Sequence, residues 1–331
     1  MSPLQFLAVG DVTTDTFIRL TDAKVACDEK GEACTITLPW SAKIPYEFAV
    51  DVSAVGNAPN AAISAARLGL KTGLLSVTGT DALGDQNVTT LKENAVDTEL
   101  VIRSAVVPSN HDYVLWYGPD RTIIRKYSTL PYRIPVETEP PPYVYLSSLG
   151  DETGALHAEL LAWLSKYPST RLVFQPGREL ALPKEKSAPL YAAAYLCILN
   201  KEEAEGVLGL PPDQDIKTLL AGMQRFGPSI AVVTNGPDGA YAFDGTRMLK
   251  VPMYLDPRPA YERTGAGDAF ASTVAAALAL GKSLDEALLW APINAMAKVQ
   301  KIGGHEGLLR RDALEKYLVD APPEYKLETL T

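Results

Sequence analysis

From about residue 143 onward, short apolar segments alternate with segments of helical character, and this alternation constrains the fold more than any other feature. The apolar segments are 143–145, 172–174, 196–199 and 230–233. Strands that alternate with helices form βαβ units, which build a mostly parallel sheet flanked by helices. The 331-residue chain is therefore predicted to be an α/β protein with one such sheet.

The rest of the chain fits the same plan. Residues 5–10 form a short apolar run followed by Asp11, which is typical of a buried strand with polar residues at its carboxyl end. Helices are predicted at 58–68, 83–94, 265–280, 284–299 and 311–318, with a further strand at 74–77. Open α/β sheets bind ligands at the carboxyl ends of their strands, so Asp11 and Asp15 are well placed for a substrate.

Two segments show strand-like alternation outside this plan. One contains residues 35–38 and 46–50, and the other has apolar runs on both sides of a Gly-Pro-Asp-Arg turn at 118–121. We expect these segments, roughly 13–50 and 111–128, to form a small β-sheet lid within a single domain of residues 1–331. A lid has two faces, and the face away from the substrate needs a partner, which predicts a homodimer.

Charge and cysteine content narrow the possible partners. A net charge of −9 argues against an extended basic surface for nucleic acid or anionic lipid. No window approaches the roughly 18 apolar residues of a membrane span, and the N-terminus lacks a signal-peptide pattern. Cys27, Cys34 and Cys197 form no Cys-x-x-Cys pair and are too few for a disulfide framework. We expect a cytoplasmic protein without nucleic acid or membrane partners.

Three kinds of catalytic site are disfavoured by missing motifs. The histidines His111, His157 and His305 have no spacing for zinc. The pair at 147–148 lacks the Gly-x-Ser-x-Gly pattern of a serine hydrolase. No Gly-x-x-x-x-Gly-Lys-[Ser/Thr] motif occurs, which excludes a P-loop kinase.

The strongest local signal is the hexapeptide RTGAGD at 263–268, a glycine-rich turn that leads into an alanine-rich helix. Free amides at a helix start bind anions, and glycine lets a phosphate approach the backbone. We predict that Gly265, Ala266 and Gly267 stabilise a phosphoryl group and that Asp268 accepts the proton of an attacking hydroxyl. The alternative is that Asp268 only interacts with the helix dipole.

This hexapeptide resembles the C-terminal signature D-T-x-G-A-G-D of the PfkB/ribokinase family of carbohydrate and nucleoside kinases. Four more segments are similar to motifs of that family in the same order, at 56–69, 79–85, 200–203 and 234–240, so the resemblance covers most of the chain. It implies a ribokinase-like three-layer fold and ATP-dependent phosphorylation of an alcohol group on a sugar or sugar-like molecule. It also implies that Asp268 is the catalytic base.

The resemblance assigns substrate contacts to residues near the N-terminus. Asp15 and Asn60 match sugar-contacting positions, and Gly56 and Asn57 belong to the same motif as Asn60. Chemistry agrees, because a carboxylate accepts hydrogen bonds from two neighbouring hydroxyls and an amide both donates and accepts. The alternatives are a solvent-exposed aspartate and a plain glycine turn before a helix.

Nucleotide contacts are implied for three later segments. Asn200 and Glu203 would hold Mg²⁺ and phosphate through water, with Glu203 as the metal ligand; the alternative is an N-terminal capping box, and both can be true. Thr234, Gly236 and Gly239 would lie under the ATP phosphates and ribose, unless they form a simple hairpin turn. Asn294 would lie against the adenine, unless it is an exposed polar residue.

The chain departs from the family pattern at two places. The usual Gly-Gly pair is Val55-Gly56, which changes the backbone on one side of the substrate. The usual Asp-Thr before G-A-G-D is Glu262-Arg263. Because many relatives use the loop of that Asp for a monovalent cation, activation by such a cation stays open here. Arg263 is itself a candidate to neutralise phosphate charge.

The identity of the substrate stays open. Arg125 and Arg178 are candidate partners for a carboxylate or phosphate, as in a sugar acid of the 2-keto-3-deoxygluconate type. Tyr113, with Trp116 and Tyr117, would instead stack on the base of a nucleoside. A catalytically silent regulator with the same fold is the non-enzymatic alternative, and the intact Asp268 argues against it.

Overall fold

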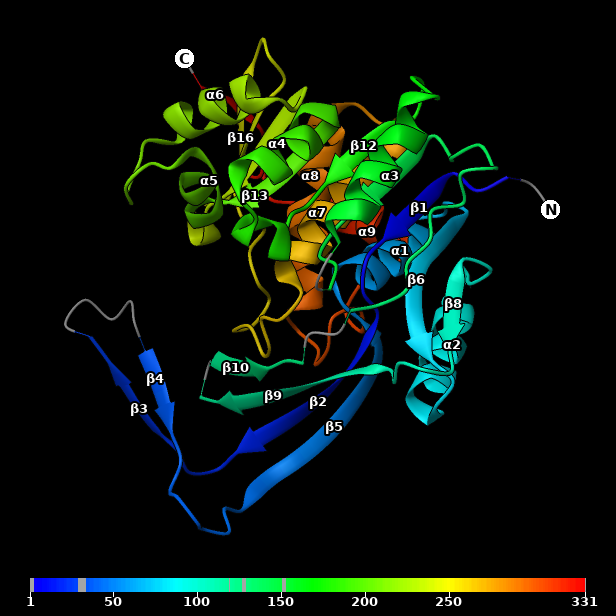
Figure 1. Cartoon of the computed structure of the whole chain (residues 1–331). Coiled ribbons are helices and arrows are strands. Elements are labelled where there is room, and N and C mark those ends of the chain that lie inside the picture. Colours follow the sequence, from blue (N-terminus) through cyan, green and yellow to red (C-terminus); the bar gives the residue numbers. More distant parts are fainter. Residues whose placement is uncertain (1–2, 29–33, 119, 127–128, 151–152, 331) are drawn as a thin grey trace.

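The structure is a computed structural model that describes residues 3–28, 34–118, 120–126, 129–150 and 153–330. A central sheet forms the middle of the molecule (Figure 1). Its strands are β1 (Phe6–Val9), β6 (Thr72–Gly79), β7 (Val96–Asp97), β8 (Val101–Ser104), β11 (Tyr143–Leu146), β12 (Arg171–Phe174), β13 (Ala194–Asn200), β14 (Ile230–Thr234), β15 (Ala240–Phe243), β16 (Met248–Val251) and β17 (Glu328–Thr329). They lie in the order β17-β16-β15-β14-β13-β12-β11-β1-β6-β7, and β8 pairs with β6.

The middle of this sheet is parallel, as the alternation of strands and helices predicted. β1 pairs in parallel with β6 and β11, and parallel pairing continues through β12, β13 and β14. β15, β16 and β17 add an antiparallel edge that the sequence pattern had not indicated. Because the central strands are parallel, the loops at their carboxyl ends meet along one edge of the sheet.

Helices cover both faces of the sheet, because successive side chains of a strand point to opposite faces. In β1, Phe6 and Ala8 join one buried cluster, and Leu7 and Val9 join the other. The first cluster includes side chains of α1 (Asn57–Arg67), α2 (Ala82–Glu93), α7 (Ala266–Ala279), α8 (Leu284–Lys298) and α9 (Arg311–Val319). The second includes side chains of α3 (Gly154–Ser165), α4 (Lys184–Ala193), α5 (Lys201–Leu208) and α6 (Ile216–Phe226). This confirms the expected three-layer fold.

The helices carry no sign of a transmembrane segment. Among the described residues, none of them combines the length and the apolar character that crossing a bilayer requires. The longest, α8, has fifteen residues, whereas a spanning helix needs roughly twenty.

Asn294 lies inside the helical layer and not on a cavity wall. Its side chain is fully buried on α8, where Nδ2 donates to Oγ1 of Thr273 on α7 at 2.8 Å. Its Oδ1 accepts from the main-chain N–H of Leu309 at 2.8 Å. The expectation that Asn294 contacts adenine is therefore wrong, because both ends of its amide join α7, α8 and the segment before α9.

A second, smaller sheet lies apart from the central one, below it in Figure 1. Its strands are β2 (Thr13–Leu20), β5 (Tyr46–Val55), β9 (Asn110–Tyr117) and β10 (Asp120–Ile124), in the order β10-β9-β2-β5. Phe17, Val52, Val55 and Val114 form its buried cluster, against which Ile302 packs. This is the small sheet that was expected as a lid. Residues 29–33, 119 and 127–128 of the predicted lid segments lie outside the described residues.

Residues 24–37 differ from the expectation in two ways. Residues 35–38 and 46–50 were expected to belong to one hairpin, but β4 (Cys34–Thr37) pairs with β3 (Lys24–Cys27), whereas β5 pairs with β2. Cys27 and Cys34 also form a disulfide, although no structural disulfide was expected. The bond is possible because the two residues lie directly opposite in the antiparallel register, with Cα atoms 4.0 Å apart. That register is a property of the folded hairpin.

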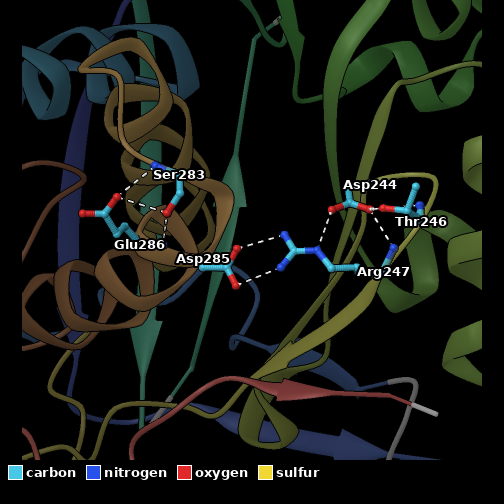
Figure 2. A network of polar contacts seen from close by, with 6 residues as sticks. All are labelled: Asp244, Thr246, Arg247, Ser283, Asp285 and Glu286. Carbon is cyan, nitrogen blue, oxygen red and sulfur yellow. Dashed lines mark hydrogen bonds and ion pairs between the residues drawn. The ribbon is translucent and has the colours of Figure 1, made fainter.

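A polar network fixes the start of α8 against the antiparallel edge of the sheet (Figure 2). Arg247, in the turn between β15 and β16, binds both carboxylate oxygens of Asp285 at 3.2 and 2.9 Å and also binds Asp244 at 3.2 Å. Ser283 and Glu286 form a capping box at the same helix start. The network is exposed, so its main effect is to set the direction of α8.

We expect Asn294→Ala to destabilise the fold and to leave nucleotide binding almost unchanged. The change leaves the hydroxyl of Thr273 and the amide of Leu309 buried without their present partner, which costs about 1–3 kcal/mol of unfolding free energy. Urea denaturation of the variant measures this loss. Gln86→Ala, which removes an exposed amide on α2, is the control. A stability loss no larger than that of Gln86→Ala would contradict the bridging role of Asn294.

Candidate active site

The polar residues expected at the carboxyl edge of the sheet do meet there. Asp11 follows β1, Asn200 ends β13 and Thr234 ends β14, and Gln175, which was not expected, follows β12. Asn200 and Thr234 are direct neighbours in the parallel register of β13 and β14. The amino end of α7 carries Asp268 toward the same edge, because Gln175 contacts Asp268.

Three side-chain amides hold the carboxylate of Asp268. Asn57 Nδ2 donates to Oδ1 at 2.8 Å and Gln175 Nε2 donates to the same oxygen at 3.1 Å. Asn60 Nδ2 donates to Oδ2 at 2.9 Å. Three donors from three side chains fix the orientation of this carboxylate. Asn60 was expected to contact the substrate, but it is 3% exposed and its Nδ2 contacts Asp268.

The turn before Asp268 has the geometry of an anion-binding helix start. Gly265 precedes α7 with a φ of 78°, a left-handed conformation that glycine adopts without strain. Ala269 N–H donates to Gly265 O at 2.9 Å, which is the first bond of the helix ladder. The amides of Gly267 and Asp268 come before that bond, at the positive end of the helix dipole. The predicted role of residues 265–267 therefore has a suitable backbone.

A cavity of about 380 Å³ lies beside this helix start. Its walls include every nucleotide-site residue predicted from the loops after β14 and before α7. The lining residues are Thr234, Gly236, Pro237, Gly239, Ala240, Met253, Asp256, Ala260, Arg263, Ala266, Gly267, Phe270, Pro292, Ala295, Met296 and Val299. Gly239 is required by its surroundings, because its φ is 91° and a Cβ would lie 2.2 Å from Val251 O. The apolar wall comes from α8 through Pro292, Ala295 and Met296, not through Asn294.

Asn200 and Glu203 form the capping box that was the alternative to metal binding. Asn200 Oδ1 accepts from Glu203 N–H at 2.8 Å, and Glu203 Oε2 accepts from Asn200 N–H at 2.9 Å. Burial raises the pKa of Glu203. In the part of the chain that the structure describes, no group of three or more acidic, histidine or cysteine side chains is arranged to hold a metal ion. Glu203 is thus a single carboxylate, suited at most to a metal that keeps its waters.

A second, smaller cavity of about 20 Å³ lies between the lid and the sheet edge. Its lining residues are Asp11, Thr13, Gly56, Asn57, Asn110, Asp112, Arg125, Lys126 and Ser148. Gly56 has a φ of 119°, and a Cβ there would lie 2.8 Å from Asp11 O. A side chain at this position would therefore collide with the main chain of Asp11. The volume accommodates about one or two water molecules. The lid is thus closed over this cavity.

Buried carboxylates lie at and beside the smaller cavity: Asp11 and Asp112 line it, and Asp15 is the neighbour of Asp112 in the lid. Asp15 and Asp112 lie opposite each other in the register of β2 and β9 and are 5% and 2% exposed. Burial raises the pKa of Asp15 to about 7, with Asp112 adding to the shift, and burial also raises the pKa of Asp112. Burial raises the pKa of Asp11 to about 6, although Tyr132 donates a hydrogen bond to Asp11. Among the described residues, neither Asp15 Oδ1 nor Asp112 Oδ1 has a hydrogen-bond donor.

Two arginines expected at a substrate carboxylate or phosphate have partners inside the protein. Arg125 Nε contacts Asp112 Oδ2 at 2.6 Å, so the charge of Arg125 is balanced within the cavity wall. The main-chain N–H of Arg178 donates to Ser148 Oγ at 3.4 Å, which places Arg178 next to a lining residue. The first contact joins residues 13 apart at the hairpin of β9 and β10, and the second joins residues 30 apart.

The expectation that Tyr113 binds the substrate is wrong. Asp112 points toward the small cavity, and alternation along β9 sends Tyr113 to the opposite face of the lid. Tyr113 is 43% exposed, and its ring packs on His111 with centroids 4.5 Å apart. Trp116 shares the inner face but is buried against Tyr261, with ring centroids 5.2 Å apart.

Gln175 and Asp112 are the residues of the candidate site that sequence analysis missed. Gln175 directly follows a predicted strand at 172–174, so the rule that located Asp11 and Asn200 would also have found Gln175. Asp112 gave no local signal. Its role depends on the parallel pairing of β2 with β9, which brings it opposite Asp15.

Comparisons with known proteins agree with this geometry. Residues 41–310 match the family described as pfkB family carbohydrate kinase. The chain is 26% identical over 269 residues to the "Bifunctional protein HldE" of Campylobacter fetus and 29% identical over 269 residues to that of Pseudomonas entomophila. Each alignment covers 75% of this chain but only 55% and 52% of those proteins, so the chain spans about half of their length.

Solved structures with similar folds cover nearly the whole chain. Arabidopsis thaliana ribokinase, solved with ribose and ATP, has a TM-score of 0.78 and 19% identity, with 95% of this chain and 98% of that chain covered. The nucleoside kinase of Methanocaldococcus jannaschii has a TM-score of 0.77 and 18% identity, with 96% and 99% covered. At such identities the likeness establishes the ribokinase-like fold.

We expect the stability of the ligand-free protein to fall as the pH rises from about 4 to about 7. In that window the folded protein keeps the proton of Asp15, whose pKa is raised from 3.8 to about 7, and the unfolded chain does not. Thermal unfolding between about pH 5 and about pH 8 measures this. Asp15→Asn removes the titrating group and is the matched variant. If the unfolding temperatures of the natural protein and of Asp15→Asn changed with pH in the same way, the attribution of the effect to Asp15 would be contradicted.

Proposed function

Because the chain belongs to the pfkB family of carbohydrate kinases, we propose that it transfers the γ-phosphoryl group of ATP to a hydroxyl of a neutral, sugar-like molecule. The position of Asp268 carries the proposal. Asp268 accepts a hydrogen bond from Asn57, and Asn57 lines the small cavity. Asp268 also directly follows Gly267, and Gly267 lines the large cavity. A base at this point reaches a hydroxyl from one side and a phosphoryl group from the other.

In this mechanism ATP binds in the large cavity, with its adenine toward the apolar wall of α8 and its phosphates toward residues 263–267. The substrate hydroxyl enters from the small cavity and gives its proton to Asp268 during in-line attack. The amides of Gly267 and Asp268, with the side chain of Arg263, stabilise the negative charge that grows on the phosphoryl oxygens.

Magnesium has a place in this proposal beside Glu203. Asn200 ends β13 next to Thr234, and Glu203 lies in the first turn of α5. Burial raises the pKa of Glu203 and the charge of Asp268 adds to the shift, so the two carboxylates act on the same region. A single carboxylate with waters and phosphate oxygens is a usual Mg²⁺ environment. The ion supplies charge neutralisation for the phosphates.

The small cavity supports a neutral polyol over a sugar acid. Asp15 Oδ1 and Asp112 Oδ1 are buried acceptors that need donors, and hydroxyl groups are donors. A substrate carboxylate has no proton to donate to these oxygens, and Arg125 is already paired with Asp112. The substrate hydroxyls are therefore expected to donate to Asp15 and Asp112.

A nucleoside is supported less well. The base would need an aromatic surface at the small cavity, but Tyr113 points to the other face of the lid and Trp116 is buried against Tyr261. The fold itself does not distinguish between a sugar and a nucleoside as the substrate. One similar structure is a nucleoside kinase, and another is a ribokinase solved with ribose and ATP.

Two further proposals concern the whole protein and are the same as those made from the sequence. We propose a single kinase domain over residues 1–331 in the cytoplasm. We also propose a homodimer through the outer face of the lid, where Tyr113 and Ile124 lie opposite each other and are 43% and 54% exposed. The exposed apolar side chains support this interface.

The proposed base is tested by Asp268→Asn. The asparagine keeps the shape of the side chain but does not take the proton, so we expect turnover to fall by about 10²- to 10⁴-fold, with little change in ATP affinity. Steady-state kinetics against a panel of sugars, sugar acids and nucleosides gives both the substrate and the effect. Asp312→Asn makes the same change in the first turn of α9 and controls for the helix dipole. Near-normal turnover in folded Asp268→Asn would refute the base.

The substrate class is tested by Asp15→Ala. We expect kcat/KM for the neutral sugar to fall by about 30- to 1000-fold, the equivalent of roughly 2–4 kcal/mol, because substrate hydroxyls lose a buried acceptor. KM for ATP should stay the same. Asp22→Ala, at an exposed carboxylate just beyond β2, is the control. Better turnover of a sugar acid than of the matching neutral sugar by the natural protein would argue against a neutral substrate.

A further inference from the structure

Lys298 is a fully buried cation beside the loop that leads to the anion-binding turn. It is the last residue of α8 and has 0% exposure. Its Nζ lies 3.0 Å from Oε2 of Glu262 and 3.2 Å from the main-chain O of the same residue. Burial lowers the pKa of Lys298, and the Glu262 carboxylate opposes that shift. A buried ammonium is costly unless it is paired, so the contact with Glu262 is needed to keep the charge.

Glu262 connects this cation to the backbone of the turn. The residue is 2% exposed, and its Oε1 accepts from Thr264 N–H at 2.6 Å. Its own N–H donates to Val299 O at 3.1 Å. The segment just before Gly265 is therefore fastened to the end of α8 by its side chain and by its backbone.

Close packing also connects the 262–265 segment to Asp268, the proposed catalytic base. A Cβ on Gly265 would lie 3.1 Å from the Cα of Gly304, and one on Gly304 would lie 2.5 Å from the side-chain amide of Asn60. Asn60 in turn donates to Asp268. A shift of the 262–265 segment would thus disturb both the amides of the anion-binding turn and the orientation of Asp268.

The donor atoms here do not fit an added monovalent cation. The family resemblance implies that such an ion occupies the loop of the residue at position 262 in many relatives. Carbonyl and carboxylate oxygens are suitable ligands for it, but in this chain Glu262 O and Oε2 both contact the ammonium of Lys298. A second cation on the same oxygens would lie within a few ångströms of Nζ and be repelled.

We propose that the ammonium of Lys298 is the built-in cation of this loop. It acts as a positioning residue that holds the 262–265 segment and, through it, the anion-binding amides, so that neither nucleotide binding nor turnover needs an added monovalent cation. The part that concerns turnover rests on the proposed kinase function. The part that concerns nucleotide binding does not.

The natural protein provides the first test. The rise in thermal unfolding temperature caused by ADP and Mg²⁺ is measured in potassium, sodium and choline chloride at equal ionic strength. We expect the three rises to agree, and turnover to agree within about twofold. A rise that appears only with potassium, or turnover about tenfold higher in potassium than in choline, would overturn the proposal. The thermal measurement needs no substrate, so it decides even if no alcohol is phosphorylated.

Lys298→Met supplies the second test, because it keeps an unbranched chain and removes the charge. We expect this variant to bind ADP more weakly in choline and to recover when potassium or ammonium ions enter the vacated position. Lys282→Met is the control, because it removes an ammonium paired with Glu286 at the other end of α8. Its ADP binding should be the same in all the salts. Weakened ADP binding that no cation restores would show that Lys298 only supports packing. If Lys298→Met does not fold, the salt comparison on the natural protein decides alone.

Discussion

The site depends on one convergence: three amide side chains from two distant parts of the chain meet on the carboxylate of Asp268. Asn57 and Asn60 come from α1, and Gln175 follows β12. Each contact is an ordinary hydrogen bond, but together they determine where both oxygens of Asp268 point. This requires α1, α7 and the sheet edge to keep their relative positions, which the alanine-rich packing of α7 in the first buried cluster provides.

The two cavities on either side of Asp268 use opposite chemistry. The larger one offers backbone amides, Arg263 and an apolar wall, which suits an anionic nucleotide. The smaller one has buried carboxyl groups at and beside it, and Asp15 Oδ1 and Asp112 Oδ1 have no donor among the described residues, which suits the hydroxyl groups of a substrate. In the proposed function, this acidic protein with a net charge of −9 would bind phosphate by local backbone geometry and not by overall charge.

Strand alternation gives the lid two different faces. Its inner face presents Asp15, Asp112 and Trp116, and its outer face presents Tyr113. The contact of Trp116 with Tyr261 joins the lid to the loop that carries Glu262 and Arg263. The lid and the loop that carries Glu262 and Arg263 are therefore in direct contact.

The amino-acid sequence by itself determined the features that arise from neighbouring residues. The parallel α/β plan, the turn at Gly265 and the capping box of Asn200 and Glu203 all follow from local periodicity and side-chain chemistry. The motif resemblance added the family and the proposed role of Asp268. What the sequence left open concerns the direction in which side chains point and the partners that they meet.

Only the tertiary structure decided those questions. Tyr113 and Asn294 were assigned to binding sites because their residue types suited the ligands, but strand phase turned one outward and helix packing enclosed the other. Gln175 meets Asp268, and Lys298 meets Glu262, across separations of 93 and 36 residues. The disulfide between Cys27 and Cys34 likewise depends on hairpin register. Such contacts are set by the packing of whole elements, and no local pattern of residues encodes that packing.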